Sequence, residues 1–312
     1  MEFSGMTFSG GVSIVWTPPS YKAIFGYGTT NGSTGVSLTN LVSNTGVVAT
    51  DTAGVGTARN ALAAAGYGTD KAIFGYGTTD GGSSSTAITN LVSNTGVVAT
   101  NTTGVGTTRY YPAATGYGTD KAIFGYGLAV SYTAITNLVS NTGVVATDTA
   151  GVGTARYGPA AAGYGSSGQA IFGYGAAGPA YSLTNLVSNT GVVATDTTGV
   201  GTARTYAAAA GYGTDKAIFG YGFSFSPLEN VSVTNLVSNT GVVATNTTGV
   251  GQIRSGLAAA GYGIGTAIFG YGAGAAYYSL TNLVSNTGVV ATDTAGVGTA
   301  RQQLAAASYG LA

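Results

Sequence analysis

The residues of this chain that could carry chemistry form a regular series. Six arginines each follow an Asp or Asn by eight residues, namely Arg59, Arg109, Arg156, Arg204, Arg254 and Arg301 after Asp51, Asn101, Asp148, Asp196, Asn246 and Asp293. Such a series could bind an anion or form six ion pairs. Because two of the partners are Asn, a carboxylate is not required, and a side-chain oxygen that caps the loop backbone explains both residue types. A planar guanidinium with five donors is suited to bracing loop carbonyls. The series therefore favours a structural ring of arginines, with a functional ring as the alternative.

Other catalytic and metal-binding chemistry has few candidates. The chain contains no His and no Cys, which removes imidazole and thiolate bases, nucleophiles and metal ligands. Glu2 and Glu229 are its only glutamates, so no pair of carboxylates recurs as glycoside hydrolysis requires. The turn Gly68–Asp70 offers too few acidic ligands for calcium. The Gly-Tyr-Gly and Gly-Val-Gly phrases precede no helix and lack the Lys-Ser/Thr tail of a phosphate loop. We expect no enzyme activity, no metal and no cofactor.

The composition also limits the partners. Only 6% of the residues are charged, the formal net charge is zero, and the basic residues are spread along the chain. Because nucleic-acid binders concentrate Lys and Arg on one face, we expect no nucleic-acid partner. No uninterrupted apolar stretch approaches the roughly eighteen residues of a membrane-spanning helix, so no membrane insertion is expected. The first residues lack the basic region and apolar run of a secretory signal.

The elements that position these residues follow from an internal repeat. The phrase Ala-Ile-Phe-Gly-Tyr-Gly begins at Ala23, Ala72, Ala122, Ala170, Ala217 and Ala267. Between 14 and 17 residues after each start comes Thr-Asn-Leu-Val-Ser-Asn-Thr-Gly-Val-Val-Ala-Thr, and successive starts are 49, 50, 48, 47 and 50 residues apart. A fixed period near fifty residues indicates a repeat architecture.

One copy contains four strand signals. In the second copy these are Ala61–Ala65, Lys71–Gly77, Ala87–Val92 and Val97–Thr100, separated by turns at Gly66–Asp70 and Ser93–Gly96 and by a Gly/Ser/Thr segment. Four short strands, repeated six times, predict an all-β fold, a six-bladed β-propeller of four-stranded antiparallel blades over residues 23–312. The small residues of the Ala run suit a crowded central axis, and the Ile and Phe of the next strand would pack blade against blade.

The two ends of the sequence suggest how the ring closes. Residues 302–310 form one Ala-rich strand with no blade after it, whereas the first copy begins at Ala23 without such a strand. We predict that residues 302–310 supply the inner strand of the first blade and remove an open sheet edge. The alternative closure uses Val12–Trp16, which precedes Pro18-Pro19 and does not match the Ala run. Residues 1–22 are predicted to be a leader that is flexible or docks to a protein partner.

Read from the arginine onward, the unit resembles the kelch repeat. Arg59, the small residues Ala63–Ala65, Ile73-Phe74 and the glycines Gly75 and Gly77 follow the order of that family. The resemblance extends from Ala23 to the C-terminus and implies a propeller fold. The chain departs from the family because Tyr76 separates the two glycines, no repeat contains Trp, and the family's Tyr–Trp pair is missing. The chromosome-condensation-regulator type of propeller repeat has a similar repeat pattern.

Because its copies are nearly identical, the chain also resembles a second group, the Gly/Thr-rich repeat proteins of marine tailed bacteriophages. The leader segment Phe8–Ile14 resembles the short leaders of such virion proteins. This resemblance implies a virion or tail-fibre component located in the virion or on an extracellular surface.

Two segments differ strongly between the copies. One follows the Gly-Tyr-Gly phrase, at Thr29–Val36, Thr78–Thr86, Leu128–Thr133, Ala176–Tyr181, Phe223–Val231 and Ala273–Tyr278. The other is the triplet after each arginine, at Asn60–Leu62, Tyr110–Pro112, Tyr157–Pro159, Thr205–Ala207, Ser255–Leu257 and Gln302–Leu304. In a four-stranded up-and-down blade both segments emerge on the same face. The opposite face would be made of nearly constant turns.

The variable segments are rich in aromatic residues among small neighbours, and they contain Tyr110, Tyr111, Tyr132, Tyr157, Tyr181, Tyr206, Phe223, Phe225, Tyr277 and Tyr278. Tyr among Gly, Ser and Asn is typical of binding loops, because its rigid ring gives contact area at low entropic cost. These ten residues are the predicted ligand-binding face, for a glycan or cell-surface polymer. Two alternatives stay open: the loops vary because solvent constrains them little, or the protein has a purely structural or assembly role, with Phe3, Phe8 and Trp16 as an attachment peptide.

Overall fold

The computed structural model describes residues 21–311, which contain nineteen strands and no helix. The strands form six antiparallel sheets. The first three sheets consist of β19 (Ala305–Leu311), β1 (Tyr21–Gly26) and β2 (Thr39–Val42); β3 (Ala63–Tyr67), β4 (Lys71–Gly75) and β5 (Thr89–Val92); and β6 (Ala113–Tyr117), β7 (Lys121–Leu128) and β8 (Tyr132–Val139). The others consist of β9 (Ala160–Tyr164), β10 (Gln169–Gly173) and β11 (Thr184–Val187); β12 (Arg204–Thr205), β13 (Ala208–Tyr212), β14 (Lys216–Phe225) and β15 (Leu228–Val237); and β16 (Ala258–Tyr262), β17 (Thr266–Gly270) and β18 (Thr281–Val284).

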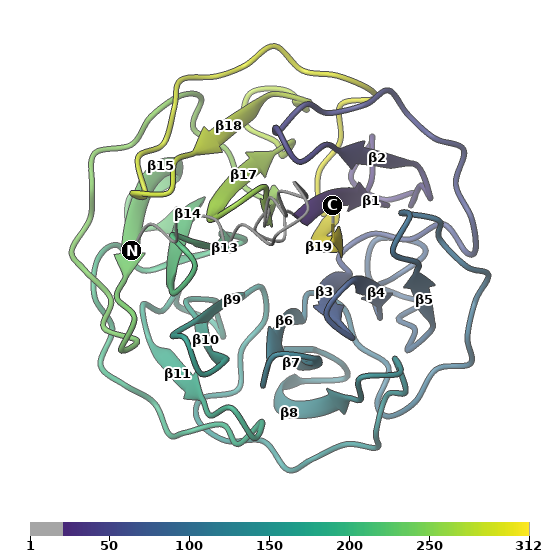
Figure 1. Cartoon of the computed structure of the whole chain (residues 1–312). Helices are drawn as coiled ribbons and strands as arrows, with labels where there is room; N and C mark the ends of the chain where they lie inside the picture. The colour runs from purple at the N-terminus through teal and green to yellow at the C-terminus, as the bar shows by residue number, and fades with distance from the viewer. Residues whose placement is uncertain (1–20, 312) are drawn as a thin grey trace, which may run out of the picture.

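The six sheets lie around a common centre, as Figure 1 shows. The small-residue strands β3, β6, β9, β13, β16 and β19 are innermost, and the strands that end in Asn-Leu-Val lie further out. Small side chains permit this crowding: a Cβ added to Gly116 in β6 would lie 3.3 Å from the carbonyl oxygen of Gly66 in the neighbouring inner strand β3. Within residues 21–311, no helix is present that could cross a membrane.

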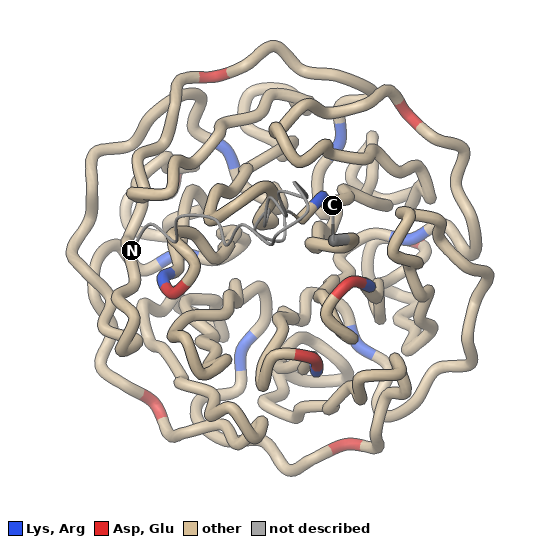
Figure 2. Tube along the Cα trace, viewed as in Figure 1, with Lys and Arg blue, Asp and Glu red and all other residues tan. Residues whose placement is uncertain are grey.

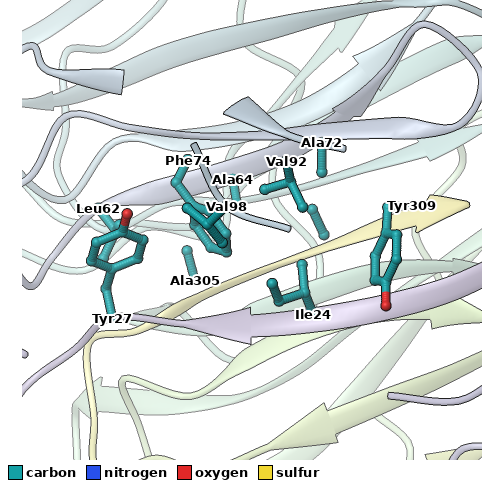
Figure 3. Close-up of a cluster of buried hydrophobic side chains, with 11 residues drawn as sticks. Ile24, Tyr27, Leu62, Ala64, Ala72, Phe74, Val92, Val98, Ala305 and Tyr309 are labelled. Carbon is teal, nitrogen blue, oxygen red and sulfur yellow. The ribbon is translucent and has the colours of Figure 1, made fainter. Parts of the chain in front are cut away.

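The middle strand of each sheet is buried on both faces. In β4 every residue after Lys71 is buried, so the apolar run does not alternate with polar residues. Phe74 packs with Ile24 of the preceding copy, whereas Ile73 packs with Phe124 of the following copy. Figure 3 shows the first of these clusters, in which Ala305 and Tyr309 of β19 join side chains from the first two copies. Packing between neighbouring sheets therefore explains the invariant Ala-Ile-Phe.

A closed cycle of backbone hydrogen bonds surrounds the centre. In each copy, the amide of the second residue after the arginine donates to the carbonyl of the equivalent residue in the preceding copy, over 2.7–3.0 Å. The cycle runs through Ala61, Tyr111, Gly158, Tyr206, Gly256 and Gln303, and Ala61 closes it by donating to Gln303. All six positions have positive φ, between 52° and 62°. Glycine, the residue best suited to this conformation, occupies two of them.

The C-terminal segment pairs with the first copy, as predicted, but its strand covers Ala305–Leu311 instead of residues 302–310. Strand β19 lies antiparallel to β1, with Ile24 opposite Ala307 and Gly26 opposite Ala305. Strand β1 begins at Tyr21, so the first sheet starts two residues before the predicted boundary at Ala23. The alternative closure through Val12–Trp16 and the predicted leader lie outside the described residues, except for Tyr21 and Lys22.

The expected fourth strand is not a regular strand. In the second copy, the outer segment touches β5 through single bridges that pair Val98 with Val92 and Thr102 with Thr89. Between these bridges the outer segment advances four residues while β5 advances three, so one extra residue breaks the ladder as a bulge does. The side-chain amide of Asn90 donates to the carbonyl of Ala99 over 3.0 Å at this point. Most sheets therefore have three strands rather than the predicted four.

Several predicted boundaries also differ. Strand β3 continues through Gly66 to Tyr67, which shortens the expected turn. Strand β4 ends at Gly75 instead of Gly77, because Tyr76 and Gly77 both have positive φ. In the third and fifth copies the variable segment after Gly-Tyr-Gly is a hairpin extension, since β14 runs to Phe225 and β15 begins at Leu228. Those two segments are therefore not loops throughout.

Candidate binding face

The six arginines brace neighbouring sheets. Arg109 donates from Nε to the carbonyl of Tyr126 over 2.9 Å and from Nη2 to Oδ1 of Asn137 over 2.8 Å. Its Nη1 donates to the carbonyl of Thr107 over 3.1 Å. Its Cζ lies 4.0 Å from the ring centroid of Tyr76 in the preceding copy, a cation–π contact. Arg109 thus joins two sheets through hydrogen bonds on one side and an aromatic face on the other.

The same cation–π contact recurs around the ring, although Nη2 of Arg59 and Nε of Arg204 have no hydrogen-bond partner among the described residues. All six arginines are fully buried, and each lies over the Tyr of the preceding Gly-Tyr-Gly phrase at 4.0–4.5 Å. Arg301 closes the series, because it lies over Tyr271 of the last copy and donates to the carbonyl of Tyr27 in the first. Burial lowers the pKa of these arginines. A buried guanidinium with these partners is placed to hold the sheets together and does not face solvent.

The Asp and Asn residues eight positions before each arginine bind a different copy. Asp148 accepts hydrogen bonds from the backbone amide and the hydroxyl of Thr107, 41 residues earlier. Asn101 accepts from the amide of Thr57 in the same way. The carboxylate nearest to Arg156 is Asp196, at 4.0 Å, and not Asp148. The interpretation of each sequence pair as one ion pair is therefore wrong, and the oxygens cap loop backbone, which serves Asp and Asn equally.

The two variable segments of each copy meet at one end of the ring. Isolated bridges pair Tyr110 with Leu128 and Tyr157 with Ala176, and β12 pairs Thr205 with Phe223. The equivalent pairs elsewhere are Thr29 with Gln302, Asn60 with Thr78, and Ser255 with Ala273. The expected juxtaposition of the two segments is thus present in all six copies.

Five of the ten predicted aromatic residues form one cluster, which we call the tyrosine cluster: Tyr110, Tyr111, Tyr132, Tyr157 and Tyr206. The ring centroids of Tyr111 and Tyr206 are 4.8 Å apart, and those of Tyr110 and Tyr111 are 5.2 Å apart. Tyr157 lies 5.7 Å from Tyr206 and stacks on Tyr132 at 5.5 Å, with 20° between the planes. The cluster brings together residues that are almost a hundred positions apart.

Exposure differs within the tyrosine cluster. The Tyr132 side chain, at the start of β8, is 41% exposed, and the other four are half-buried. Burial raises the pKa of Tyr111 to about 12 and also raises the pKa of Tyr110 and Tyr206. These hydroxyls therefore stay protonated and can donate hydrogen bonds at neutral pH. At the centre of the ring, Tyr111, Tyr206 and Gln303 line a pocket of about 70 Å³.

The other predicted aromatic residues lie outside the tyrosine cluster. Phe223 and Phe225, on β14, form their own edge-to-face pair with centroids 5.7 Å apart. Tyr181, Tyr277 and Tyr278 are half-buried, and among the described residues they stack on no other ring. Sequence reasoning missed Gln303, Pro112 and Pro159, which line the small central pocket. Their place in the variable triplets was the available signal. No group of His, Cys, Asp or Glu within the described part of the chain could hold a metal ion.

Comparison with known proteins found no family model and no curated protein that match this chain.

Proposed function

We propose that the chain is a six-bladed β-propeller that acts as a non-enzymatic recognition module. Six sheets around one centre, each pairing three or more strands, support the propeller (Figure 1). The closed cycle of hydrogen bonds between equivalent residues supports it as well, because a cycle requires that the last copy meets the first. In this proposal the variable face binds a glycan or cell-surface polymer, and the protein is a component of a phage virion or tail fibre.

The tyrosine cluster is the observation that carries this proposal. A tyrosine ring offers a flat apolar face for the C–H face of a sugar, and its hydroxyl can bond to sugar hydroxyls. Tyr132 is the most accessible member, and Tyr157 stacks behind it. The chain has few charges, and its six arginines are buried, which suits an uncharged polymer better than a strongly ionic one.

The proposal can be tested with two single variants, Tyr132→Ala and Tyr110→Ala. We expect the full-length protein to bind at least one member of a panel of cell-surface glycans, and each variant to bind roughly tenfold more weakly or worse. Isothermal titration calorimetry measures both affinities, and circular dichroism confirms that the variants stay folded.

Tyr21→Ala is the matched control, because Tyr21 is 37% exposed and lies at the opposite end of the ring. It should leave glycan affinity unchanged. Binding that survives both cluster variants, or that Tyr21→Ala also removes, would contradict a site at the tyrosine cluster.

A purely structural or assembly role is the second candidate. One observation favours it: the same valine of the constant turn is 65–67% exposed in all six copies, at Val47, Val97, Val144, Val192, Val242 and Val289. An exposed apolar residue repeated six times could contact a symmetrical partner in an assembly. If no glycan binds and replacing these valines with Ser prevents incorporation into particles, the assembly role is favoured over recognition.

A further inference from the structure

A second cavity lies at the end of the ring opposite to the tyrosine cluster. Its volume is about 600 Å³, within the range of roughly 300–1,000 Å³ that ligand pockets occupy. Residues from all six inner strands line it, mainly Ala and Gly, together with the turns that join inner and middle strands. Towards the tyrosine cluster, Leu62, Leu257 and Leu304 are buried and line the smaller pocket. The cavity therefore has an inner wall made mainly of small side chains.

The charged residues that line this cavity are all basic. They are Lys71, Lys121 and Lys216, and none of the described residues that line it is acidic. Because all six arginines are buried, the four lysines of the chain carry its accessible positive charge, and three of the four lie here. The cavity is therefore lined by three of the four accessible cationic side chains of the chain.

Each of these lysines also contacts the aspartate that precedes it. The distances from Nζ to Oδ1 are 2.9 Å for Lys71–Asp70, 3.0 Å for Lys121–Asp120 and 2.7 Å for Lys216–Asp215. Figure 2 shows these acidic and basic positions side by side on turns near the middle of the ring. Asp120 is held by the outer turn, since its Oδ2 accepts from Nδ2 of Asn141 over 3.1 Å.

The lysines can exchange these contacts for a ligand. Their side chains are 43–47% exposed, and exposed ion pairs of this kind contribute little to stability. An ammonium on a flexible stem can turn towards an anion in the cavity without breaking any other contact of the fold. The hydroxyls of Thr69, Thr119 and Thr214 are further donors among the residues that line the cavity.

We propose that this cavity binds a small organic anion that carries two or three carboxylate or phosphate groups on a compact apolar body. The lysines, one in each of three copies, contact the anionic groups, and the alanine methyl groups of the inner strands contact the body. The site is separate from the proposed recognition face, so neither proposal depends on the other.

The test uses the full-length chain at low ionic strength, with citrate, trimesate (benzene carrying three carboxylates) and inorganic phosphate as probes. We expect at least one tricarboxylate to bind more tightly than inorganic phosphate, because phosphate lacks the apolar body. The triple variant Lys71→Gln, Lys121→Gln, Lys216→Gln should bind that probe roughly tenfold more weakly or worse. Calorimetry gives the affinities, and added sodium chloride should weaken binding to the natural chain more than to the variant.

Two controls make the result decisive. Lys22→Gln removes one positive charge at the equivalent position of the first copy, where the side chain does not line the cavity, and should change the affinity little. The uncharged triamide of trimesate should not bind. The proposal is overturned if neither citrate nor trimesate binds, or if the triple variant binds them as tightly as the natural chain does.

Discussion

At the scale of single residues, the invariant Gly-Tyr-Gly phrase is explained by contacts between copies. A Cβ on Gly75 would lie 2.7 Å from Cζ of Phe124, so only glycine leaves room for the phenyl ring of the next copy. Tyr76 packs against the same ring edge-to-face at 5.1 Å and has a φ of 65°. Its ring also contacts the guanidinium of Arg109, and its hydroxyl donates to the carbonyl of Val105 over 3.2 Å. The phrase therefore forms the joint between sheets, which accounts for its repetition without any catalytic role.

This joint gives a prediction for Gly75→Ala. The added methyl group cannot avoid Phe124, and overpacking of a core costs about 1–3 kcal/mol, so we expect the free energy of unfolding to fall by about 2 kcal/mol. Urea denaturation followed by circular dichroism measures the change. In a Phe124→Leu background, where the ring is absent, the same substitution should cost clearly less. Equal costs in both backgrounds would show that the close approach is not the cause.

The sequence predicted the bracing role of the arginines from their donors but could not identify their partners. Hydrogen bonds such as Thr107 to Asp148 join neighbouring copies, so the constant spacing of eight residues within a copy pointed to the wrong pair. The topology of a blade likewise predicted which face holds the variable aromatic residues. It could not predict that Tyr111 meets Tyr206 while Tyr277 stays apart, because those contacts depend on how each segment packs at the centre.

At the scale of elements, the strand signals located the inner and middle strands better than the outer one. The apolar run Ala72–Phe74 is buried by two neighbouring sheets, so its unbroken apolar pattern indicates a middle strand that is buried on both faces. The outer segment Val97–Thr100 is rich in β-branched residues, as strands are, but it pairs with β5 only through isolated bridges. Side-chain bonds from Asn90 to Ala99 and Asn101 lie along it, and propensity alone does not reveal such bonds.

The C-terminal strand gives the prediction at this scale. A chain that ends at Arg301 loses β19 with its buried Tyr309, loses the buried Leu304 just before β19, and leaves β1 with an unpaired edge. Burial of a large apolar side chain contributes about 1.5–3 kcal/mol, so we expect a loss of several kcal/mol in the free energy of unfolding. Thermal and urea denaturation measure it. A synthetic peptide of residues 302–312 should restore part of the stability in trans. A truncated chain as stable as the full one would show that β19 does not hold the ring together.

At the scale of the whole molecule, the period and the unmatched end strand were enough to predict six units and the pairing of the last strand with the first. They could not predict that the cavities at the two ends of the ring differ in size. At one end Tyr111 and Tyr206 line a pocket of about 70 Å³, and at the other end the lysines line a cavity of about 600 Å³. This asymmetry depends on the size of the residues in the variable triplets and on side-chain directions, which a repeat pattern does not contain.

The buried tyrosines of the Gly-Tyr-Gly phrases, which join neighbouring sheets, predict how the whole molecule responds to alkali. Burial raises the pKa of Tyr126, Tyr221 and Tyr271 to about 12, from an ordinary value of 10.0. In the unfolded chain these hydroxyls lose their protons near pH 10, whereas the folded chain retains them up to about pH 12. Their stabilising contribution is therefore complete below pH 10 and is lost as the pH rises towards 12, by up to about 1.4 kcal/mol per pH unit for each group.

Because the three effects add, we expect cooperative unfolding in this window, with tyrosinate absorbance rising as the circular dichroism signal disappears. Tyr126→Phe removes one titrating hydroxyl and its hydrogen bond to the carbonyl of Val152. That variant should be less stable at neutral pH but lose stability less steeply between pH 10 and 12. If all the tyrosines instead ionise near pH 10 while the fold stays intact, the Gly-Tyr-Gly rings are open to solvent and the joint is not the sealed contact between sheets described above.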